Sequence, residues 1–274
     1  MSQSASRALS VGCIRGHNCG MTHKPPPHVV ARLRAAGCVF AEDEAALLIA
    51  AASTESDLER MIVARVAGDP LEYVVGWAEF MGIRIAVEPG VFVPRPRTRF
   101  LVEQAIARTS PGAIVVDLCC GVGALGAALA AAVDVQLYCA DIDQDAVRAA
   151  SRNVAHVYQG DLFDALPTEL RGRIDTLICN TPYVPTAEIE LLPREARLYE
   201  NRVTLDGGAD GLDVQRRVAA QAGGWLAPGG WLLVESSQRQ SAASAALFES
   251  AGLTATISSD LDADATVVIG QRRA

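Results

Sequence analysis

Apolar side chains between residues 28 and 68 recur every three or four positions, which is the spacing of an amphipathic α-helix. Three such stripes predict helices near residues 28–36, 45–51 and 58–66. The third stripe follows Thr54-Glu55-Ser56-Asp57, which is typical of a capped helix N-terminus. We therefore expect a small helical domain over residues 28–70.

Alternation of apolar and polar residues replaces this helical spacing after residue 71. Trp77 and Phe80 precede Met81-Gly82, and alternating apolar residues follow it, which predicts a β-hairpin. We expect residues 71–90 to form a hairpin linker. The prolines that follow exclude a helix until a further helical stripe over residues 98–107.

The rest of the chain alternates short apolar runs with helical patterns. The runs predict strands near residues 113–117, 135–140, 156–158, 174–179, 231–235, 254–258 and 266–270. The patterns between them predict helices near residues 124–132, 146–154, 214–222 and 241–251. This alternation predicts an α/β fold, a Rossmann-like doubly wound sheet of seven strands, over residues 91–274.

Length and charge limit the classes of function that this protein can have. A chain of 274 residues holds one large domain and a small one. The net charge of −8 argues against nucleic-acid binding and favours a protein partner or a small cationic or neutral substrate. Since no apolar run is long enough for a membrane, we expect a cytoplasmic protein without a membrane partner, as a monomer or a homodimer.

The first 27 residues are polar and end in Lys24-Pro25-Pro26-Pro27, so we expect a disordered leader followed by a stiff linker. Cys13, His17, Cys19 and His23 are possible metal ligands within it. Their spacing fits no zinc finger that we can justify, and the segment lacks the apolar periodicity of a fold. We therefore predict no metal site.

A glycine-rich turn joins the first predicted strand of the sheet to its helix. Its spacing, Gly121-x-Gly123-x-x-Gly126, also fits the dinucleotide fingerprint, although such a match alone is weak evidence. Asp117 immediately before the glycines would repel a pyrophosphate but attract the sulfonium and ammonium groups of S-adenosylmethionine. We therefore favour an S-adenosylmethionine loop, and a purely structural tight turn remains the alternative.

Acids end three successive predicted strands: Asp117, Asp141 and Asp161. Ligands of such sheets bind across the carboxyl ends of the strands. Asp141 lies roughly 20 residues past the glycine turn, where a carboxylate accepts from a ribose diol, and Asp161 suits the exocyclic amine of adenine. Each acid alone could be a helix N-cap, but together they indicate a cofactor site.

Asn180-Thr181-Pro182-Tyr183 follows the fourth predicted strand. Methyl transfer to a planar nitrogen requires acceptors that orient its N–H groups, so that the lone pair faces the methyl group. The Asn180 side-chain oxygen and the Thr181 carbonyl are such acceptors, and the Tyr183 ring can stack on a planar group. By itself, this composition is also common in turns.

These motifs together resemble the HemK/PrmC-type family of N(5)-glutamine methyltransferases, which modify peptide-chain release factors. The matching blocks are residues 68–73, 77–82, 89–96, 117–121, 180–183 and 205–212. The resemblance implies a class I methyltransferase that uses S-adenosylmethionine and releases S-adenosylhomocysteine. It also implies that the N-terminal helical domain recognises a protein substrate.

The motifs and the resemblance together assign candidate residues. The cofactor is expected to contact Phe92, Pro94, Arg95, Asp117, Cys119, Gly121, Gly123, Asp141, Ile142, Gly160, Asp161, Leu162 and Asn180. The catalytic loop is expected to be Asn180, Thr181, Pro182 and Tyr183. The substrate is expected to contact Glu79, Phe80, Tyr183 and Glu200.

Three departures from the family pattern concern the acceptor. Thr181 replaces the usual proline or alanine, Arg97-Thr98-Arg99 replaces Glu-Thr-Glu, and Glu200-Asn201 replaces Glu-Pro. The default acceptor is the glutamine of a protein such as a release factor. One alternative acceptor is a small molecule with a guanidine or amide group, such as arginine, paired with Glu79, Glu200 or Asp206. Another is a nucleic-acid adenine. A third alternative is a protein that binds the cofactor without turnover.

Overall fold

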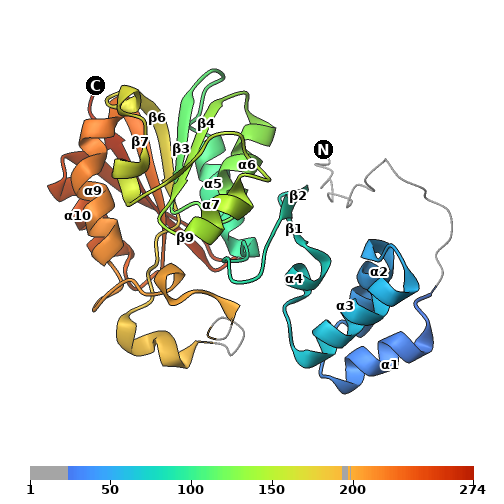
Figure 1. Cartoon of the computed structure of the whole chain (residues 1–274). Coiled ribbons are helices and arrows are strands. Elements are labelled where there is room, and N and C mark those ends of the chain that lie inside the picture. Colours follow the sequence, from blue (N-terminus) through green and yellow to red (C-terminus); the bar gives the residue numbers. More distant parts are fainter. Residues whose placement is uncertain (1–23, 193–196, 198) are drawn as a thin grey trace, which may run out of the picture.

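The computed structural model describes residues 24–192, 197 and 199–274, as a large α/β part and a smaller helical part (Figure 1). The first 23 residues of the predicted leader, with Cys13, His17, Cys19 and His23, lie outside the described residues. Of the helices in the described ranges, none combines the length and the apolar character needed to cross a membrane.

The helical part confirms the three helices that the apolar stripes predict. Its described helices are α1 (Pro27–Ala35), α2 (Ala41–Ala51), α3 (Glu55–Ala67) and α4 (Leu71–Val75). Val29, Leu33 and Leu48 form the centre of a core that belongs to these helices. Thr54 caps α3, since its hydroxyl accepts a hydrogen bond from the backbone N–H of Asp57 at 3.1 Å.

Helix α4 differs from the sequence prediction, which places residues 71–75 in the hairpin linker. Pro70 precedes the helix, where its missing N–H costs nothing. Leu71, Val74 and Val75 pack against the core of α1–α3, and burial of this apolar face favours a helical turn over a strand. Five residues are too few for a periodicity to reveal this.

The predicted hairpin is present as β1 (Trp77–Phe80) and β2 (Ile83–Ala86), which pair antiparallel. Met81 and Gly82 have φ of 50° and 80°, as a two-residue type I′ turn requires. Ala78, Phe80 and Ile85 are buried in the core of the large part. The hairpin therefore packs on the α/β part.

Within the described residues, the large part has a seven-stranded sheet in the order β5-β4-β3-β6-β7-β9-β8. Its strands are β3 (Ile114–Leu118), β4 (Gln136–Asp141), β5 (Val157–Gln159), β6 (Ile174–Cys179), β7 (Leu226–Ser236), β8 (Leu253–Asp260) and β9 (Ala265–Arg272). Strand β9 runs antiparallel to both of its neighbours, and the other pairs are parallel. The predicted doubly wound sheet is confirmed.

Helices cover both faces of this sheet (Figure 1). One face carries α5 (Arg99–Ile106), α6 (Ala124–Ala132) and α7 (Gln144–Ala150), and the other carries α9 (Asp213–Trp225) and α10 (Ser241–Ser250). Short 3-10 turns complete the described elements: η1 (Pro96–Thr98), η2 (Leu162–Ala165), η3 (Thr168–Leu170), η4 (Thr186–Leu191) and η5 (Arg202–Thr204).

Strand β7 is longer than the sequence predicts. The residues Pro228-Gly229-Gly230 indicate a turn before a strand at 231, yet β7 begins at Leu226 and passes through them with a shift of register against β6. A Cβ on Gly230 would lie 2.7 Å from the Ile174 carbonyl oxygen, so glycine is what permits this close approach.

Strand register decides which side chains meet at the carboxyl edge. Asp117 of β3 pairs with Ile178 of β6, and Cys179 pairs with Val234 of β7. Since side chains alternate along a strand, Asp117 and Glu235 face the α5/α6 side with Ile178. Asn180, the first residue after β6, is level with Glu235.

Candidate active site

The turn between β3 and α6 has a backbone that few side chains allow. Cys119, Gly121 and Gly123 all have positive φ, of 55°, 53° and 74°. A Cβ on Gly126 would lie 2.9 Å from Leu137 and 3.2 Å from the Asp117 carboxylate. This glycine therefore lets α6 start close to the sheet, with its N-terminal N–H groups at the sheet edge.

Asp117 is a buried acid, and only one of its two carboxylate oxygens has a hydrogen-bond partner among the described residues. Its Oδ2 accepts a hydrogen bond from the Gly126 N–H at 2.9 Å, whereas its Oδ1 is buried without a partner in the described residues. Burial raises the pKa of Asp117 to about 7; the Gly126 hydrogen bond opposes this shift, and the charge of Asp141 adds to it. The site therefore favours a cationic ligand that would pair with the carboxylate.

Asp141, at the end of β4, joins two loops. Its Oδ2 accepts from the Gly121 N–H at 2.8 Å, and its Oδ1 accepts from the Asp143 N–H at 2.9 Å. Burial raises the pKa of Asp141, and these hydrogen bonds counteract the shift. Each oxygen keeps a second lone pair for a hydroxyl of a ligand. Next to it, Ile142 exposes 53% of its surface.

The third acid, Asp161, lies in a different environment. Its carboxylate pairs with Arg217 of α9 at 2.6 Å and is half exposed. Gly160 donates to the Asp141 carbonyl at 3.0 Å, and Leu162 is buried with a φ of 50°. The Asp161 segment thus lies beside Asp141, but one oxygen of the carboxylate for which the sequence predicts a contact with adenine is paired with Arg217.

The proline-rich segment after the hairpin lies against the glycine turn. A Cβ on Gly121 would be 4.0 Å from the Phe92 carbonyl oxygen. The Arg95 guanidinium stacks over the Phe92 ring at 5.1 Å and forms an ion pair with Glu200, while Pro94 is buried. Glu200, predicted to bind substrate, is therefore engaged by a residue of the same protein.

Residues 205–212 brace the loop that follows β6. Val184 donates to the Leu205 carbonyl at 3.1 Å, and Gly207 donates to the Val184 carbonyl at 2.9 Å. A Cβ on Gly207 would lie 2.7 Å from the Pro182 carbonyl oxygen. The glycines of this block thus allow backbone to pack on backbone, which fixes the positions of Pro182 and Tyr183.

Within this loop, Asn180 and Thr181 keep hydrogen-bonding capacity. Thr181 is 1% exposed, and its Oγ1 has no partner in the described residues. Asn180 is partly exposed beside it. The side-chain oxygen of Asn180 and the carbonyl of Thr181 are the acceptors that the sequence predicts for an incoming N–H group.

Tyr183 forms a cluster with two residues that the sequence interpretation did not assign. Arg97 donates to its hydroxyl, and that hydroxyl lies 3.4 Å from Glu235 Oε1, which also accepts from Arg97 Nε at 3.2 Å. Burial, with the charge of Glu235, raises the pKa of Tyr183 to about 12. The sequence marks Arg97 only as a departure from the family pattern, and it gives no signal for Glu235, because only the strand order shows that the end of β7 adjoins the end of β6.

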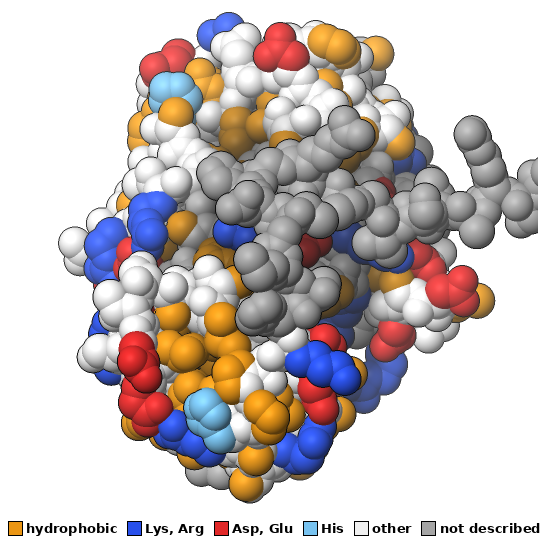
Figure 2. Space-filling model, turned by 90° about the vertical axis from the view of Figure 1, so that its right-hand side faces the viewer, with side chains coloured by type: hydrophobic (Ala, Val, Ile, Leu, Met, Phe, Trp, Pro, Cys, Tyr) orange, Lys and Arg blue, Asp and Glu red, His pale blue; other side chains and the backbone are white. Residues whose placement is uncertain are grey.

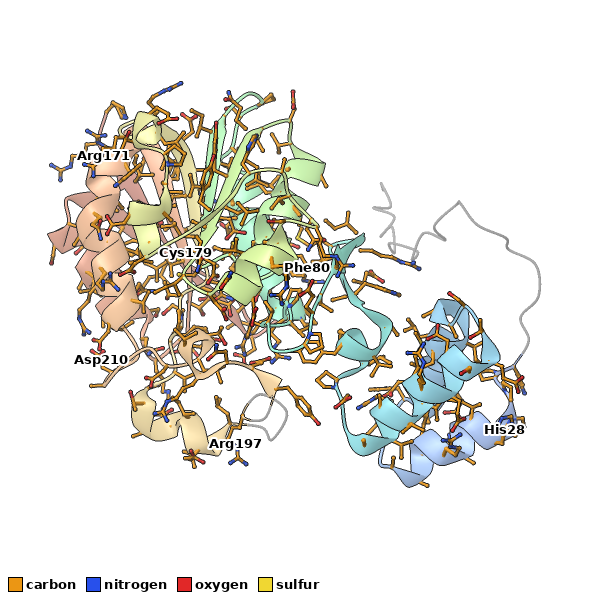
Figure 3. All side chains as sticks on the ribbon, viewed as in Figure 1. His28, Phe80, Arg171, Cys179, Arg197 and Asp210 are labelled. Atoms are coloured by element: carbon orange, nitrogen blue, oxygen red, sulfur yellow. The ribbon has the colours of Figure 1, made fainter. Side chains whose placement is uncertain are left out.

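Of the other residues proposed to meet the substrate, Glu79 and Phe80 lie on the hairpin and not at this edge, whereas Asp206 pairs with Val184 of the loop that follows β6. Glu79 lies exposed on the hairpin, opposite Arg84, and Phe80 is 3% exposed within the core (Figure 3). Asp206 accepts from the Thr186 hydroxyl at 2.6 Å and pairs with Arg202. These positions give no support to a substrate contact by Glu79 or Phe80.

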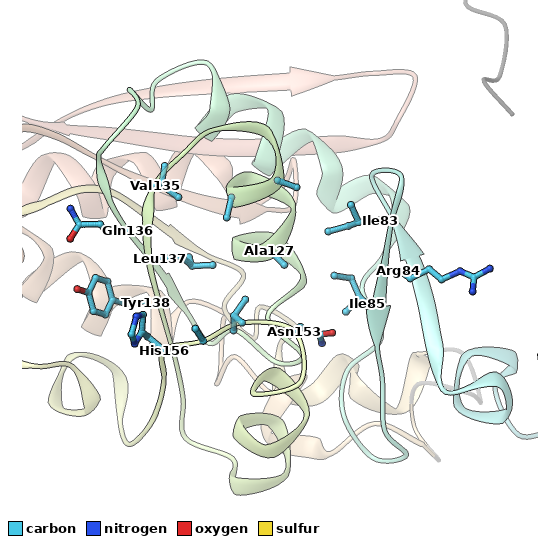
Figure 4. Close-up of a pocket in the computed structure, with 14 residues that line it drawn as sticks. Ile83, Arg84, Ile85, Ala127, Val135, Gln136, Leu137, Tyr138, Asn153 and His156 are labelled. Carbon is cyan, nitrogen blue, oxygen red and sulfur yellow. The ribbon is translucent and has the colours of Figure 1, made fainter. Parts of the chain in front are cut away.

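A groove of about 650 Å³ lies elsewhere, between the hairpin and the α6–β4 region (Figure 4). Ile83 and Ile85 face Ala127 and Leu137 across it, and the Arg84 side chain points away. The groove adjoins the start of β4, whereas Asp141 ends that strand, so it is not the candidate site. In the part of the chain that the structure describes, no group of three His, Cys, Asp or Glu residues is placed to hold a metal ion.

The fold and the carboxyl edge define a class I S-adenosylmethionine-dependent methyltransferase. The family model of the methyltransferase small domain matches residues 82–195. A methyltransferase from Pyrococcus furiosus has a TM-score of 0.55 with 15% identity, covering 80% of this chain and 100% of its own. The 16S rRNA N2 G1207 methyltransferase of T. thermophilus has a TM-score of 0.53 with 21% identity, covering 72% of this chain and 50% of its own. Both likenesses concern the fold alone.

The relatives found by sequence indicate a narrower class of methyltransferase than the fold does. A release factor glutamine methyltransferase from Geobacter sulfurreducens is 37% identical over 64% of this chain and 63% of its own length, so the chain covers less than two thirds of that relative. The corresponding enzyme from Xylella fastidiosa is 34% identical over 81% of this chain and 83% of its own length. The chain therefore belongs to the family of release factor glutamine methyltransferases. A 4-amino-L-phenylalanine/4-methylamino-L-phenylalanine methyltransferase from Streptomyces pristinaespiralis is also 39% identical, over 69% of this chain and 68% of its own length.

Proposed function

We propose that this chain transfers a methyl group from S-adenosylmethionine to a planar side-chain nitrogen, by default the amide of a protein glutamine. The observation that carries this proposal is that Asp117 of β3 and Asn180, which follows β6, lie at the carboxyl edge of neighbouring strands. A cofactor held at Asp117 and an acceptor held at Asn180 would then share one site.

The cofactor residues fit the charge of the group that they would hold. The unpartnered Oδ1 of Asp117 suits the ammonium group, and the open lone pairs of Asp141 suit the ribose diol. The exposed Ile142 side chain beside Asp141 offers an apolar surface to adenine. When bound, S-adenosylmethionine supplies an electrophilic methyl group on a sulfonium.

The acceptor loop would orient the nucleophile. The Asn180 side-chain oxygen and the Thr181 carbonyl accept N–H groups from the planar nitrogen, which turns its lone pair toward the methyl group. Tyr183 stacks beside it, held by Arg97 and Glu235. Because the block at residues 205–212 fixes this loop, the entropy of positioning is lost on folding and not in the transition state.

A protein substrate is supported by the helical part. Its exposed apolar side chains, Val39, Phe40, Val63 and Val66, are of the kind that protein interfaces cover. Figure 2 shows apolar side chains among charged ones on the face that carries this part. A hollow of about 470 Å³ between α3 and the segment around Pro89 also offers room for a peptide next to Tyr73. We place this reaction in the cytoplasm.

A free amino acid with an aromatic amine is the second candidate. The relative from Streptomyces pristinaespiralis is named for such substrates, and it is as similar to this chain as the release factor enzymes are. Arginine as a substrate has less support, since Glu200 and Asp206 are already paired with arginines of this protein. The net charge of −8 argues against a nucleic-acid acceptor.

A labelled-methyl transfer assay tests these proposals, with purified release factor, 4-amino-L-phenylalanine, L-arginine and free L-glutamine in parallel. We expect label on release factor, and label on 4-amino-L-phenylalanine alone would instead establish the second candidate. Asn180→Ala should abolish transfer while cofactor affinity stays within about threefold, because the side-chain acceptor for the N–H group is lost and Asp117 and Asp141 remain. Transfer that survives this change would refute the assignment of the acceptor loop.

A further inference from the structure

Glu235 is the penultimate residue of β7, at the carboxyl edge beside β6. The pairing of Cys179 with Val234 puts Glu235 level with Asn180, the first residue after β6. Alternation along the strands puts Glu235 on the α5/α6 side, as it does Asp117 of β3. Glu235 is thus an acid next to the candidate acceptor site, to which the proposed function gives no role beyond holding Tyr183.

The two carboxylate oxygens of Glu235 differ. Its side chain is 5% exposed, and Oε1 is occupied by the Arg97 guanidinium at 3.2 Å and the Tyr183 hydroxyl at 3.4 Å. Oε2 is buried and has no hydrogen-bond partner in the described residues. A buried, unpartnered carboxylate oxygen is unfavourable, so this oxygen is suited to a donor that a ligand brings.

Arg97 and Tyr183 fix which way that oxygen faces. Two donors on Oε1 leave the carboxylate little freedom to rotate, and the Arg97 guanidinium lies 6.0 Å from the centre of the Tyr183 ring. The Tyr183 carbonyl is held in turn by Gln240 at 3.0 Å. The Glu235 carboxylate is therefore held next to Tyr183 by a preorganised cluster through Oε1, and Oε2 is the oxygen of this carboxylate left for a ligand.

We infer that Glu235 is a further acceptor-binding residue, whose Oε2 accepts an N–H of the nitrogen that is methylated, an inference that rests on the proposed function. Glu235 Oε2 would take one N–H, and the Asn180 oxygen and the Thr181 carbonyl would share the other, so the substrate class is a primary planar nitrogen with two hydrogens. As the N–CH₃ bond forms from the nitrogen lone pair, the S–CH₃ bond breaks and its electron pair stays on sulfur. The nitrogen becomes cationic, and the proton it shares with Oε2 passes to the Glu235 carboxylate.

Glu235→Gln tests this most sharply, because it keeps the shape of the side chain. An amide has one oxygen, so either Arg97 or the methyl acceptor faces an NH₂ group in place of an acceptor. Glu188→Gln is the matched control, since Glu188 is a surface acid paired with Arg239. With purified release factor and 4-amino-L-phenylalanine as probes, we expect kcat/KM to fall at least a hundredfold in Glu235→Gln. Its affinity for S-adenosylmethionine should stay within twofold, and Glu188→Gln should match the unmodified protein.

Glu235→Asp is a second variant, which keeps the charge but shortens the side chain by one methylene. We expect kcat/KM to fall by at least a hundredfold in this variant too. If both variants bind the cofactor normally and keep kcat/KM within threefold, Glu235 does not bind the acceptor and the inference is overturned. A tenfold or greater loss of cofactor affinity in Glu235→Gln would overturn it too, because the residue would then act on the cofactor. An unmodified protein that labels neither probe would instead refute the proposed function itself.

Discussion

The carboxylate of Asp141 accepts a hydrogen bond from the backbone N–H of Gly121 at 2.8 Å, across two neighbouring strands of the sheet. Its other oxygen accepts from Asp143 at 2.9 Å. The acid that ends β4 therefore holds the glycine turn that follows β3. One side chain both shapes the proposed cofactor loop and offers lone pairs to the cofactor.

Asp141→Asn should therefore act mainly by weakening the binding of the cofactor. The amide nitrogen cannot accept from a backbone N–H, so one of the two loops loses its anchor. We expect the Kd for S-adenosylmethionine to rise at least tenfold by calorimetry, with a loss of about 1–2 kcal/mol in the free energy of unfolding. Asp145→Asn is the control, because Asp145 is exposed and paired only at the surface with Arg148. Equal affinities in the two variants would refute the role of Asp141.

Asp117 should make cofactor binding depend on pH. Since its pKa is raised to about 7 from 3.8, the folded protein holds this proton more tightly than the unfolded chain does. The contribution of Asp117 to the stability of the cofactor-free protein is therefore largest below pH 4 and is lost as the pH rises toward 7. A cationic ligand prefers the carboxylate, so its affinity should rise with pH up to about 7 and then level off.

Calorimetric titrations of S-adenosylmethionine between pH 5.5 and 8.5 measure this, with Asp117→Asn as the control. The amide that this substitution introduces does not titrate, so the variant should bind weakly with a flatter dependence on pH. Thermal unfolding of both proteins without cofactor, over the same range, isolates the contribution of Asp117 to stability. A wild-type affinity as insensitive to pH as that of the variant would contradict the assignment of this acid to the cofactor.

Gly211→Ala should damage the acceptor loop, and Gly229→Ala should not. Both glycines have φ of 79°, so alanine costs similar backbone strain of about 1–2 kcal/mol at either position. A Cβ on Gly211 would overlap the carbonyl oxygen of Tyr183, whereas nothing lies within 4 Å of a Cβ on Gly229. We expect methyl transfer to drop at least tenfold in Gly211→Ala alone, with a lower melting temperature than in Gly229→Ala. Equal activity in both variants would show that the loop tolerates displacement.

Sequence patterns predict the elements of this fold well where one face of a long element is buried. The strand over residues 174–179 and the helix over residues 124–132 fall where the structure has β6 and α6. The short helix α4 and the first residues of β7 do not follow from local pattern. There, packing on a distant core or a neighbouring strand outweighs the preference of the local sequence.

The sequence by itself determined the doubly wound class and the candidate acids, because alternating strands and helices put the carboxyl ends of the parallel strands at one edge. It could not determine which acids are free. Only the tertiary structure decided that Asp117 keeps an unpartnered oxygen while Asp161 is paired with Arg217, and Glu200 with Arg95. It also decided that Glu235, 55 positions after Asn180, lies level with it. Such pairings depend on strand order and register, which bring together residues far apart in the chain and leave no mark in a local pattern.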